Sequence, residues 1–431
     1  MRKVFLLFLM LLTILALTGA AVWAQEAAKP AAPATPQAAP PAVAPQPSSE
    51  TPKPAATEPA KATPAAPEAA KPAPGKRYTL EEAIAATPKG TGKGMINPDA
   101  PKGFLDIPGA PRSFFLYYIL WGIWVGWIFS SVGAFGGVMA GVGHMSVFGL
   151  GNYAQSFGEK KPLNTVLTDS IRGSNQFLAG LSAFITSFTY YRMGRLVLPL
   201  GLVLGLGSLG AYLAIEFSVG KIDLKMYMGY FGLIVFAVAF VLFYETTPQG
   251  QARKKAAKAA AQAFEAAQSQ KTSEVSDEYT RGVQVTHWGL TRIAFTFYGS
   301  EFSFNPIWPF LGGIVISAIS AFIGVGGGFL YVPFLTSVTG LPMFIVAGTS
   351  AMAVFISMVV GLTQFITKGV PFDYTMISME MIGVFIGSIV GPATSKYISE
   401  IWLKRIFVLL AIYVGLGYTL KGFFKIALPG I

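Results

Sequence analysis

The residues best suited to chemistry are closely spaced glycines inside an apolar stretch. Gly324, Gly326, Gly327 and Gly328 stand within five positions, and Pro333 follows them. Each glycine costs a helix about 1 kcal/mol, so this group should interrupt any helix that contains it. Unwound backbone in an apolar environment must line a polar cavity or be buried, and free N–H groups at the start of a half-helix attract anions. The group predicts an anion site, with close helix packing as the alternative.

A weaker copy of this glycine group lies earlier, at Gly133, Gly136 and Gly137. Polar residues inside apolar stretches are expensive in a membrane and usually functional there. They add five candidates for the same binding site, which are Ser170, Arg172, Asn175, Thr349 and Ser350. Arg172 carries a planar fork of donors suited to an anion, but Asp169 stands three positions earlier and could neutralise it instead. Both interpretations stay open, as does plain helix–helix hydrogen bonding for the hydroxyl groups.

Few other residues could transfer protons or bind metals. His144 titrates near neutral pH when unperturbed, and Glu380 lies inside an apolar segment, so both are candidates for proton coupling. A histidine that is merely solvated is the alternative for His144. The chain has two histidines and no cysteine, which excludes disulfides, thiol catalysis and thiolate metal sites. We expect no catalytic residues, no metal and no cofactor, and a protein that is not an enzyme.

The elements that carry these residues are apolar and long. The 431 residues are 53% hydrophobic and only 12% charged, with a mean hydropathy of +0.54. The net charge of +11 comes from lysines and arginines scattered between apolar runs, as at the ends of membrane spans, and no compact basic patch indicates nucleic-acid binding. The candidate spans are 113–138, 163–190, 196–217, 226–244, 307–338, 342–367, 372–397 and 402–425. The predicted class is an all-α polytopic membrane protein.

The eight segments form two groups of four, which indicates an internal duplication. The three early glycines align with Gly324, Gly327 and Gly328 at an offset of 191 residues, and Ser170 aligns with Ser350 at 180. Transporters built from such repeats bind their substrates where the repeats meet. The predicted parts are a first repeat at 113–245, a polar loop at 246–306 and a second repeat at 307–431.

The direction of the two repeats depends on the glycine-broken segments. The stretch 307–338 is too short for two full spans of about 20 residues, so it is one broken span or a re-entrant hairpin. The first alternative makes the repeats parallel and the second makes them inverted. The inverted arrangement is favoured, because it places Arg192 and Arg195 in the cytoplasm. Small residues four positions apart predict close helix packing at Gly383, Gly387 and Gly391, and at Gly201 and Gly205.

The N-terminal part reads as a targeting segment followed by a spacer. Residues 1–24 have a basic start, an apolar run and small residues before Gln25, which is typical of a secretory signal peptide, with an uncleaved signal anchor as the alternative. Residues 25–112 are predicted to form a disordered extracytoplasmic tether. Its part 25–75 is rich in proline and alanine and cannot bury enough apolar surface to fold, and a short amphipathic piece at 80–84 precedes chain rich in glycine and proline.

The second half resembles a known family. The motif GVGGGFLYVP at 324–333, the pair Leu341 and Pro342, and the run VAGTS at 346–350 resemble the sulfite exporter TauE/SafE family. The likeness covers 306–425 well and 113–245 more loosely. It implies a multi-pass protein of the bacterial inner membrane that moves sulfite, a sulfonate or a related anion. The first half departs from the pattern, with Thr-Asp-Ser at 168–170 in place of Gly-Thr-Ser.

These observations predict an exporter or permease for a small anion, working by alternating access at the interface of the two repeats. The expected partners are the anionic solute and the lipid bilayer, with homo-oligomerisation left open and no nucleic acid. The alternative is a non-transporting membrane anchor or sensor subunit that presents its tether to a partner.

Overall fold

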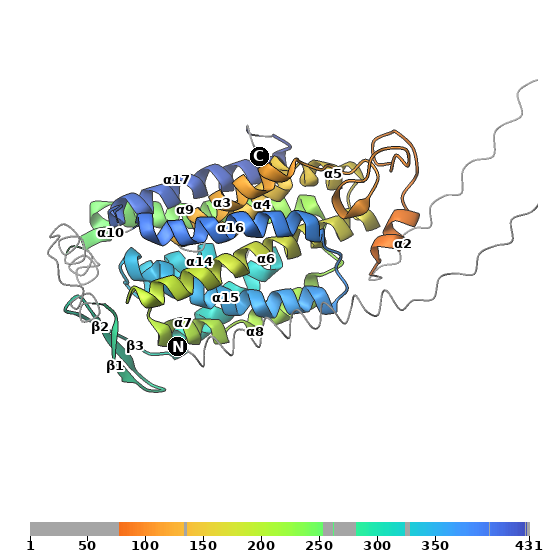
Figure 1. The fold of residues 1–431 in the computed structure, drawn as a ribbon. Coiled ribbons are helices and arrows are strands. Elements are labelled where there is room, and N and C mark those ends of the chain that lie inside the picture. Colours follow the sequence, from red (N-terminus) through yellow and green to blue (C-terminus); the bar gives the residue numbers. More distant parts are fainter. Residues whose placement is uncertain are drawn as a thin grey trace, which may run out of the picture. The chain divides into compact units, whose positions relative to one another are not determined.

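The computed structural model describes residues 77–132, 136–252, 262, 282–323, 328–395, 397–426 and 428. Two compact units divide the chain, 1–66 and 67–431, and the first lies outside the described residues. The predicted signal segment 1–24 and most of the predicted tether therefore lie outside them too. Figure 1 shows the second unit as a set of long helices lying side by side.

The described helices follow the apolar segments. In the first half they are α3 (Phe115–Val132), α4 (Gly136–Val142), the π-turn η2 (Gly143–Val147), α5 (Leu150–Ser156), α6 (Pro162–Arg192), α7 (Leu198–Leu206), α8 (Leu209–Ser218), α9 (Leu224–Thr246) and α10 (Pro248–Ala252). In the second half they are α13 (Ile307–Ile323), α14 (Gly328–Pro333), the π-turn η3 (Phe334–Val338), α15 (Met343–Thr367), α16 (Tyr374–Ser395), α17 (Glu400–Thr419) and the π-turn η4 (Leu420–Phe424).

Local signals set the ends of these helices. Pro162 opens α6 at a position where its missing N–H costs nothing, and Gly194 ends the turn after α6 with a positive φ of 63°. The Asp223 side chain accepts the N–H of Met226 at 2.9 Å and caps α9. Four helices are long and apolar enough to cross a membrane by length and composition: Leu198–Ser218, Met343–Thr367, Tyr374–Thr394 and Arg405–Phe424.

Each half begins with a hairpin of helices that enters the bundle and turns back. Val132 ends α3, and α4 with η2 returns along it, so that Trp121 donates to the Met139 carbonyl at 3.2 Å. In the second half, η3 returns beside the start of α13, where a Cβ on Gly312 would meet the ring of Phe334 at 2.6 Å. The π-turns η2 and η3 lie 191 residues apart, which is the offset of the two glycine groups.

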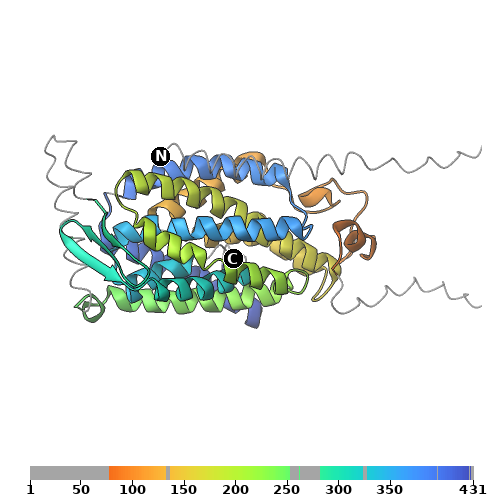
Figure 2. The same ribbon diagram turned by 90° about the horizontal axis from the view of Figure 1, so that it is seen from below.

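The two hairpins open toward opposite ends of the bundle. The start of α6, the end of α8 and the residues after α15 line one cavity, so these three termini share one end, called the cavity end below. Gly194, after α6, accepts the N–H of Val283 at 2.7 Å beside the small sheet, which marks the sheet end. Figures 1 and 2 show α2 near the cavity end and the sheet at the other. The α3 hairpin opens at the cavity end, because α3 runs parallel to α16, and the α13 hairpin opens at the sheet end.

Glycines bring the backbones of several helices together. A Cβ on Gly383 or Gly387 would overlap the Ile119 or Ile123 carbonyl of α3, which confirms the predicted close packing of this stripe. The close packing predicted for Gly201 and Gly205 in α7 is confirmed as well. A Cβ on Gly201 would lie 2.9 Å from Met352 Cβ and 3.3 Å from the Thr349 carbonyl of α15, and a Cβ on Gly205 would overlap Ile356. Shortly after these two glycines, Gly207 and Gly210 meet the backbone of α13 at Gly313 and Ile314.

Two segments differ from the sequence-based expectations. The loop 246–306 contains an antiparallel sheet of β1 (Gln284–Trp288), β2 (Ile293–Phe297) and β3 (Ser300–Phe304), so the fold is not purely helical. Side chains along β2 alternate between buried and half-buried, as in a strand with one covered face, and a tight turn at Tyr298 and Gly299 connects β2 to β3.

The tether predicted for 25–112 is ordered from residue 77 onward. It contains α2 (Leu80–Ala85), capped by Thr79 and Glu82, and the 3₁₀ turn η1 (Phe104–Asp106). Phe104 and Ile107 are buried, and the Leu105 N–H donates to the Asp373 carboxylate at 3.2 Å. Burial of these side chains offsets the entropy of ordering the segment, so residues 77–112 of the predicted tether are ordered in this structure.

Candidate functional site

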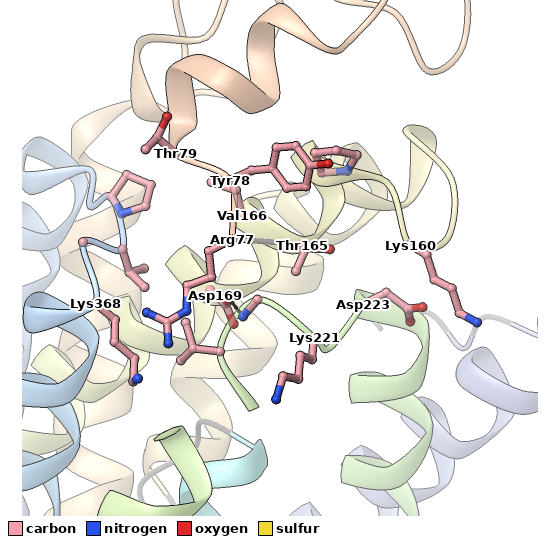
Figure 3. A pocket seen from close by; sticks show the side chains of 16 residues that line it. Arg77, Tyr78, Thr79, Lys160, Thr165, Val166, Asp169, Lys221, Asp223 and Lys368 are labelled. Atoms are coloured by element: carbon pink, nitrogen blue, oxygen red, sulfur yellow. Dashed lines mark hydrogen bonds between the residues drawn. The ribbon is translucent and has the colours of Figure 1, made fainter. Parts of the chain in front are cut away.

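A cavity of about 410 Å³ opens at the cavity end of the bundle. Its charged lining residues are Arg77, Lys160, Lys221, Lys368, Asp169 and Asp223. Figure 3 shows these side chains converging from several elements, with Asp169 beneath Arg77. Cations outnumber carboxylates on this wall, and a concave site of one charge raises the local concentration of the opposite ion. The cavity is therefore suited to a small anion.

Asp169 connects this cavity to a buried arginine one turn further along α6. Its carboxylate accepts the Gly220 N–H at 2.7 Å and pairs with Arg172 Nη1 at 2.7 Å. Arg172 is fully buried, and its Nη2 also donates to Ser218 Oγ at 2.9 Å and to the Ala321 carbonyl at 3.0 Å. This arrangement is the second of the two interpretations of Arg172, in which Asp169 neutralises it.

The position of Arg172 is nevertheless informative. Ala321 belongs to the last turn of α13, where carbonyls point out of the helix and carry its negative dipole end. The guanidinium binds this end and also lies 5.4 Å from the ring centre of Phe365 in α15. Arg172 thereby ties α6, α8 and α13 together directly before the glycine group of the second half. Gly324, Gly326 and Gly327 lie outside the described residues, while Gly328 is the buried first residue of α14.

A second buried polar cluster joins the two halves. His144 in η2 contacts Asn175 Oδ1 of α6 through Nδ1 at 2.5 Å, and Glu380 Oε2 of α16 through Nε2 at 2.8 Å. All three residues are fully buried. The alternative in which His144 is solvated is therefore wrong, because η2 continues α4 back into the bundle and carries the ring inside.

Unpartnered polar atoms occur within this cluster and beside it. Among the described residues, Asn175 Nδ2 and the Tyr227 hydroxyl are buried without a hydrogen-bond partner. Both face Gly141, since a Cβ there would lie 3.5 Å from Asn175 Nδ2 and 3.8 Å from the Tyr227 oxygen. Other buried polar groups in this state are those of Ser170, Ser174, Gln176, Ser320 and Glu380 Oε1. Buried donors without partners cost free energy, which a polar guest would recover.

The other residues predicted for the site serve packing in this structure. Gly136 and Gly137 begin α4, and Gly136 presses on Phe129; Gly133 lies outside the described residues. Pro333 is the buried last residue of α14. Thr349 accepts the Val197 N–H at 3.1 Å and donates to Ile345, and Ser350 donates to Ala347. The structure therefore shows the alternative for these two hydroxyl groups, which is hydrogen bonding within a helix and, for Thr349, also to a neighbouring segment.

Tyr227 and the basic residues of the cavity were not singled out from the sequence. The lysines stand in separate loops, and no pattern along the chain indicates that they meet. Tyr227 lies in an apolar helix with six other aromatic residues, so its position carries no signal by itself.

These features define a class of protein. The chain has helices with exposed apolar side chains, two helix hairpins that open toward opposite ends, a basic cavity and buried polar clusters between the halves. Together these features indicate a multi-pass membrane transport protein. The model of the sulfite exporter TauE/SafE family matches residues 118–418, so the chain belongs to this family of membrane transporters for sulfite and related anions. No curated protein and no solved structure matches the chain.

Proposed function

We propose that this protein is a secondary transporter for a small anion of oxidised sulfur, sulfite or a sulfonate, working by alternating access. The observation that carries the proposal is the basic cavity, whose lining residue Asp169 pairs with the buried Arg172 beside the end of α13. A positive cavity at the mouth of a bundle concentrates anions, and the glycine group of the second half begins at Gly324, the residue directly after the end of α13 at Ile323. In this proposal, an anion that leaves the cavity is bound next by the backbone donors of that group.

The proposed moving parts are two inverted halves, 113–245 and 307–431, joined by 246–306. In support, both halves consist of a hairpin with a π-turn followed by three further long passes, and the equivalent helices α6 and α15, and α9 and α17, pack on each other. The helices α9 and α17 run antiparallel. Gly229 of α9 lies against Gly422 of η4, and Phe236 of α9 lies against Gly415 of α17. Two inverted halves of similar structure can adopt two alternative packing arrangements, and the central site faces one side of the membrane in each.

The proposed binding residues are the two glycine groups and the polar groups on α6. The second-half group is Gly324, Gly326, Gly327 and Gly328; the first-half group is Gly133, Gly136 and Gly137. Asn175 Nδ2 contributes donors, and Arg172 becomes available to the anion if the hairpin of α13 moves and releases it. The proposed location is the bacterial inner membrane, with the cavity facing outward, on the side to which the predicted signal delivers residue 25.

The direct test is flux in proteoliposomes that contain the purified chain. Radiolabelled sulfite, sulfate, thiosulfate and methanesulfonate are offered in turn, and saturable uptake of at least one is expected. Gly327→Leu should insert normally and lose this flux, because a large side chain blocks the backbone donors. Wild-type vesicles that take up none of the four anions faster than protein-free vesicles would favour the anchor or sensor function instead. Unchanged flux in the Gly327 variant would exclude the glycine site.

A further inference from the structure

The His144–Glu380 contact links the hairpin of the first half to α16 of the second half, and its geometry indicates which protons it holds. Asn175 Oδ1 accepts, so the ring nitrogen facing it, Nδ1, must carry a proton. The other ring nitrogen lies 2.8 Å from a carboxylate oxygen, and a hydrogen bond there needs a second proton between Nε2 and Oε2. The contact therefore holds two protons, one fixed by Asn175 and one shared with Glu380.

Loss of the shared proton reverses the interaction. A neutral ring with its proton on Nδ1 presents a lone pair at Nε2, and the ionised carboxylate presents another. Two acceptors at hydrogen-bond distance repel, and their burial leaves no water to separate them. The ring and the carboxylate must then move apart, or another donor must come between them.

This contact crosses between the parts proposed to move. His144 belongs to the hairpin of the first half, and Glu380 belongs to α16 of the second half, 236 residues away in sequence. Among the described residues, Tyr118 of α3 and Asp373 before α16 are the titratable groups that act on the Glu380 carboxylate besides His144, and Tyr227 of α9, Tyr418 of α17 and Arg172 of α6 form a neighbouring group. Tyr418 reaches Ser146 of the same π-turn at 3.3 Å, Arg172 pairs with Asp169, and the second carboxylate oxygen of Glu380 has no hydrogen-bond partner in the part of the chain that the structure describes. None of the five groups makes a hydrogen bond to His144 or Glu380 in this structure.

We propose that the His144–Glu380 pair is a proton-binding site that couples anion transport to the movement of one proton. The inference rests on the transport function proposed above. With the proton bound, the pair joins the first hairpin to α16; without it, the contact opens, and the conformational equilibrium shifts. Asn175 positions the ring and also presents Nδ2 toward Gly141, so one side chain contacts both the proton site and the donor-rich region proposed for the anion.

The proton positions can be observed directly, because the chain has only two histidines. Histidine-selective nitrogen labelling gives two ring systems by NMR, and His287→Gln, at an exposed position on β1, leaves only the signals of His144. We expect Nδ1 to stay protonated while Nε2 loses its proton as the pH rises. An unprotonated Nδ1, or ring signals of His144 that do not change with pH, would overturn the assignment.

Transport measurements separate coupling from binding. With the membrane potential clamped at zero, one coupled proton produces about tenfold accumulation of sulfite per unit of pH gradient, since one pH unit is about 1.36 kcal/mol. Glu380→Gln should lose this accumulation but retain sulfite exchange, in which no net proton movement is needed. His287→Gln should retain both, because its side chain lies outside the cluster.

The outcomes distinguish this inference from the transport proposal. Absence of sulfite exchange in the wild type, together with no flux of the other three anions, overturns the transport function itself. Exchange without any response to the pH gradient overturns only the coupling. If Glu380→Gln does not fold, His144→Gln is the second variant, since its amide preserves hydrogen-bonding groups without a titrating proton. Accumulation that survives in either folded variant contradicts the proposal, and the NMR titration of the wild type decides it if neither folds.

Discussion

At the scale of single residues, the charges at the cavity end have separate tasks. Lys368 pairs with Glu216 of α8 at 2.6 Å, and Asp169 pairs with the buried Arg172, so these residues fasten helices as well as line the cavity. Lys221 lines the cavity and forms no ion pair among the described residues. The positive potential at the mouth of the cavity therefore depends chiefly on groups such as Lys221. The ion-paired residues Lys368 and Asp169 instead hold together the helices that form the cavity wall.

Reversing the charge of Lys221 tests the proposed attraction of anions. Lys221→Glu should raise the KM for sulfite by about tenfold at low salt, because the cavity loses two units of positive charge. The increase should shrink as salt screens the field. Initial uptake rates in proteoliposomes at two ionic strengths measure both effects.

Lys225→Glu is the matched control, since Lys225 lies outside the cavity and pairs with Glu159 at 2.6 Å on the surface. The Lys225 ammonium holds the pKa of Glu159 below its usual range, so this exposed pair stays ionised at neutral pH. Exposed pairs contribute little to stability. An equal rise of KM in both lysine variants would show that total charge, and not the cavity, attracts the anion.

Removing the buried cation tests the packing role of Arg172. Arg172→Met leaves the Asp169 carboxylate buried without its partner, which should lower the free energy of unfolding by about 3 to 5 kcal/mol. The double variant with Asp169→Asn should recover part of the loss, because no uncompensated charge remains. Thermal unfolding in detergent measures this, and a single variant as stable as the wild type would contradict the pairing.

At the scale of elements, α3 and α16 pack with their backbones in close contact. Gly122 and Gly126 of α3 meet α16, while Gly383 and Gly387 of α16 meet α3. Each glycine occupies a place where a Cβ would overlap a carbonyl of the other helix. Because α16 also carries Glu380, this seam determines how the second half is placed against the first hairpin.

A matched pair of substitutions tests the seam. Gly383→Ala should destabilise the folded protein by about 1 to 3 kcal/mol, because the added carbon forces the two backbones apart. Gly180→Ala on α6 is the control, since its Cβ would lie 3.4 Å from Met358 Cβ, an ordinary contact. Thermal stability in detergent compares them, and equal effects would show that close approach at Gly383 is not required.

At the scale of the whole molecule, the ends of the bundle must lie on opposite sides of the membrane. The chain contains no cysteine, so single cysteines can be introduced without first removing others. Lys160 is exposed at the cavity end, and Thr291 is exposed in the turn between β1 and β2. A membrane-impermeant maleimide should label Lys160→Cys in intact cells and Thr291→Cys only after lysis. Labelling of both from one side would contradict the inverted arrangement in the membrane.

Several features of this protein follow from the sequence alone. The apolar segments, the glycine breaks and the family motif at 324–333 are local patterns, and the family match over 118–418 confirms the resemblance. Asn175 and Glu380 were candidates because polar residues in apolar segments are costly inside a bilayer whatever their neighbours, and His144 was a candidate because an unperturbed imidazole titrates near neutral pH. The pairing of Arg172 with Asp169 was one of two alternatives, since residues three apart share a helix face.

The tertiary structure decided which of these residues meet. His144 reaches Glu380 only because η2 turns back into the bundle beside α16, and the basic cavity exists only because loops far apart in sequence end at one face. The small sheet and the ordered segment from residue 77 likewise depend on contacts with the bundle. Hydrophobicity and glycine content act locally along the chain, whereas burial, charge pairing and the direction of each hairpin depend on how distant segments pack, and no local pattern contains that information.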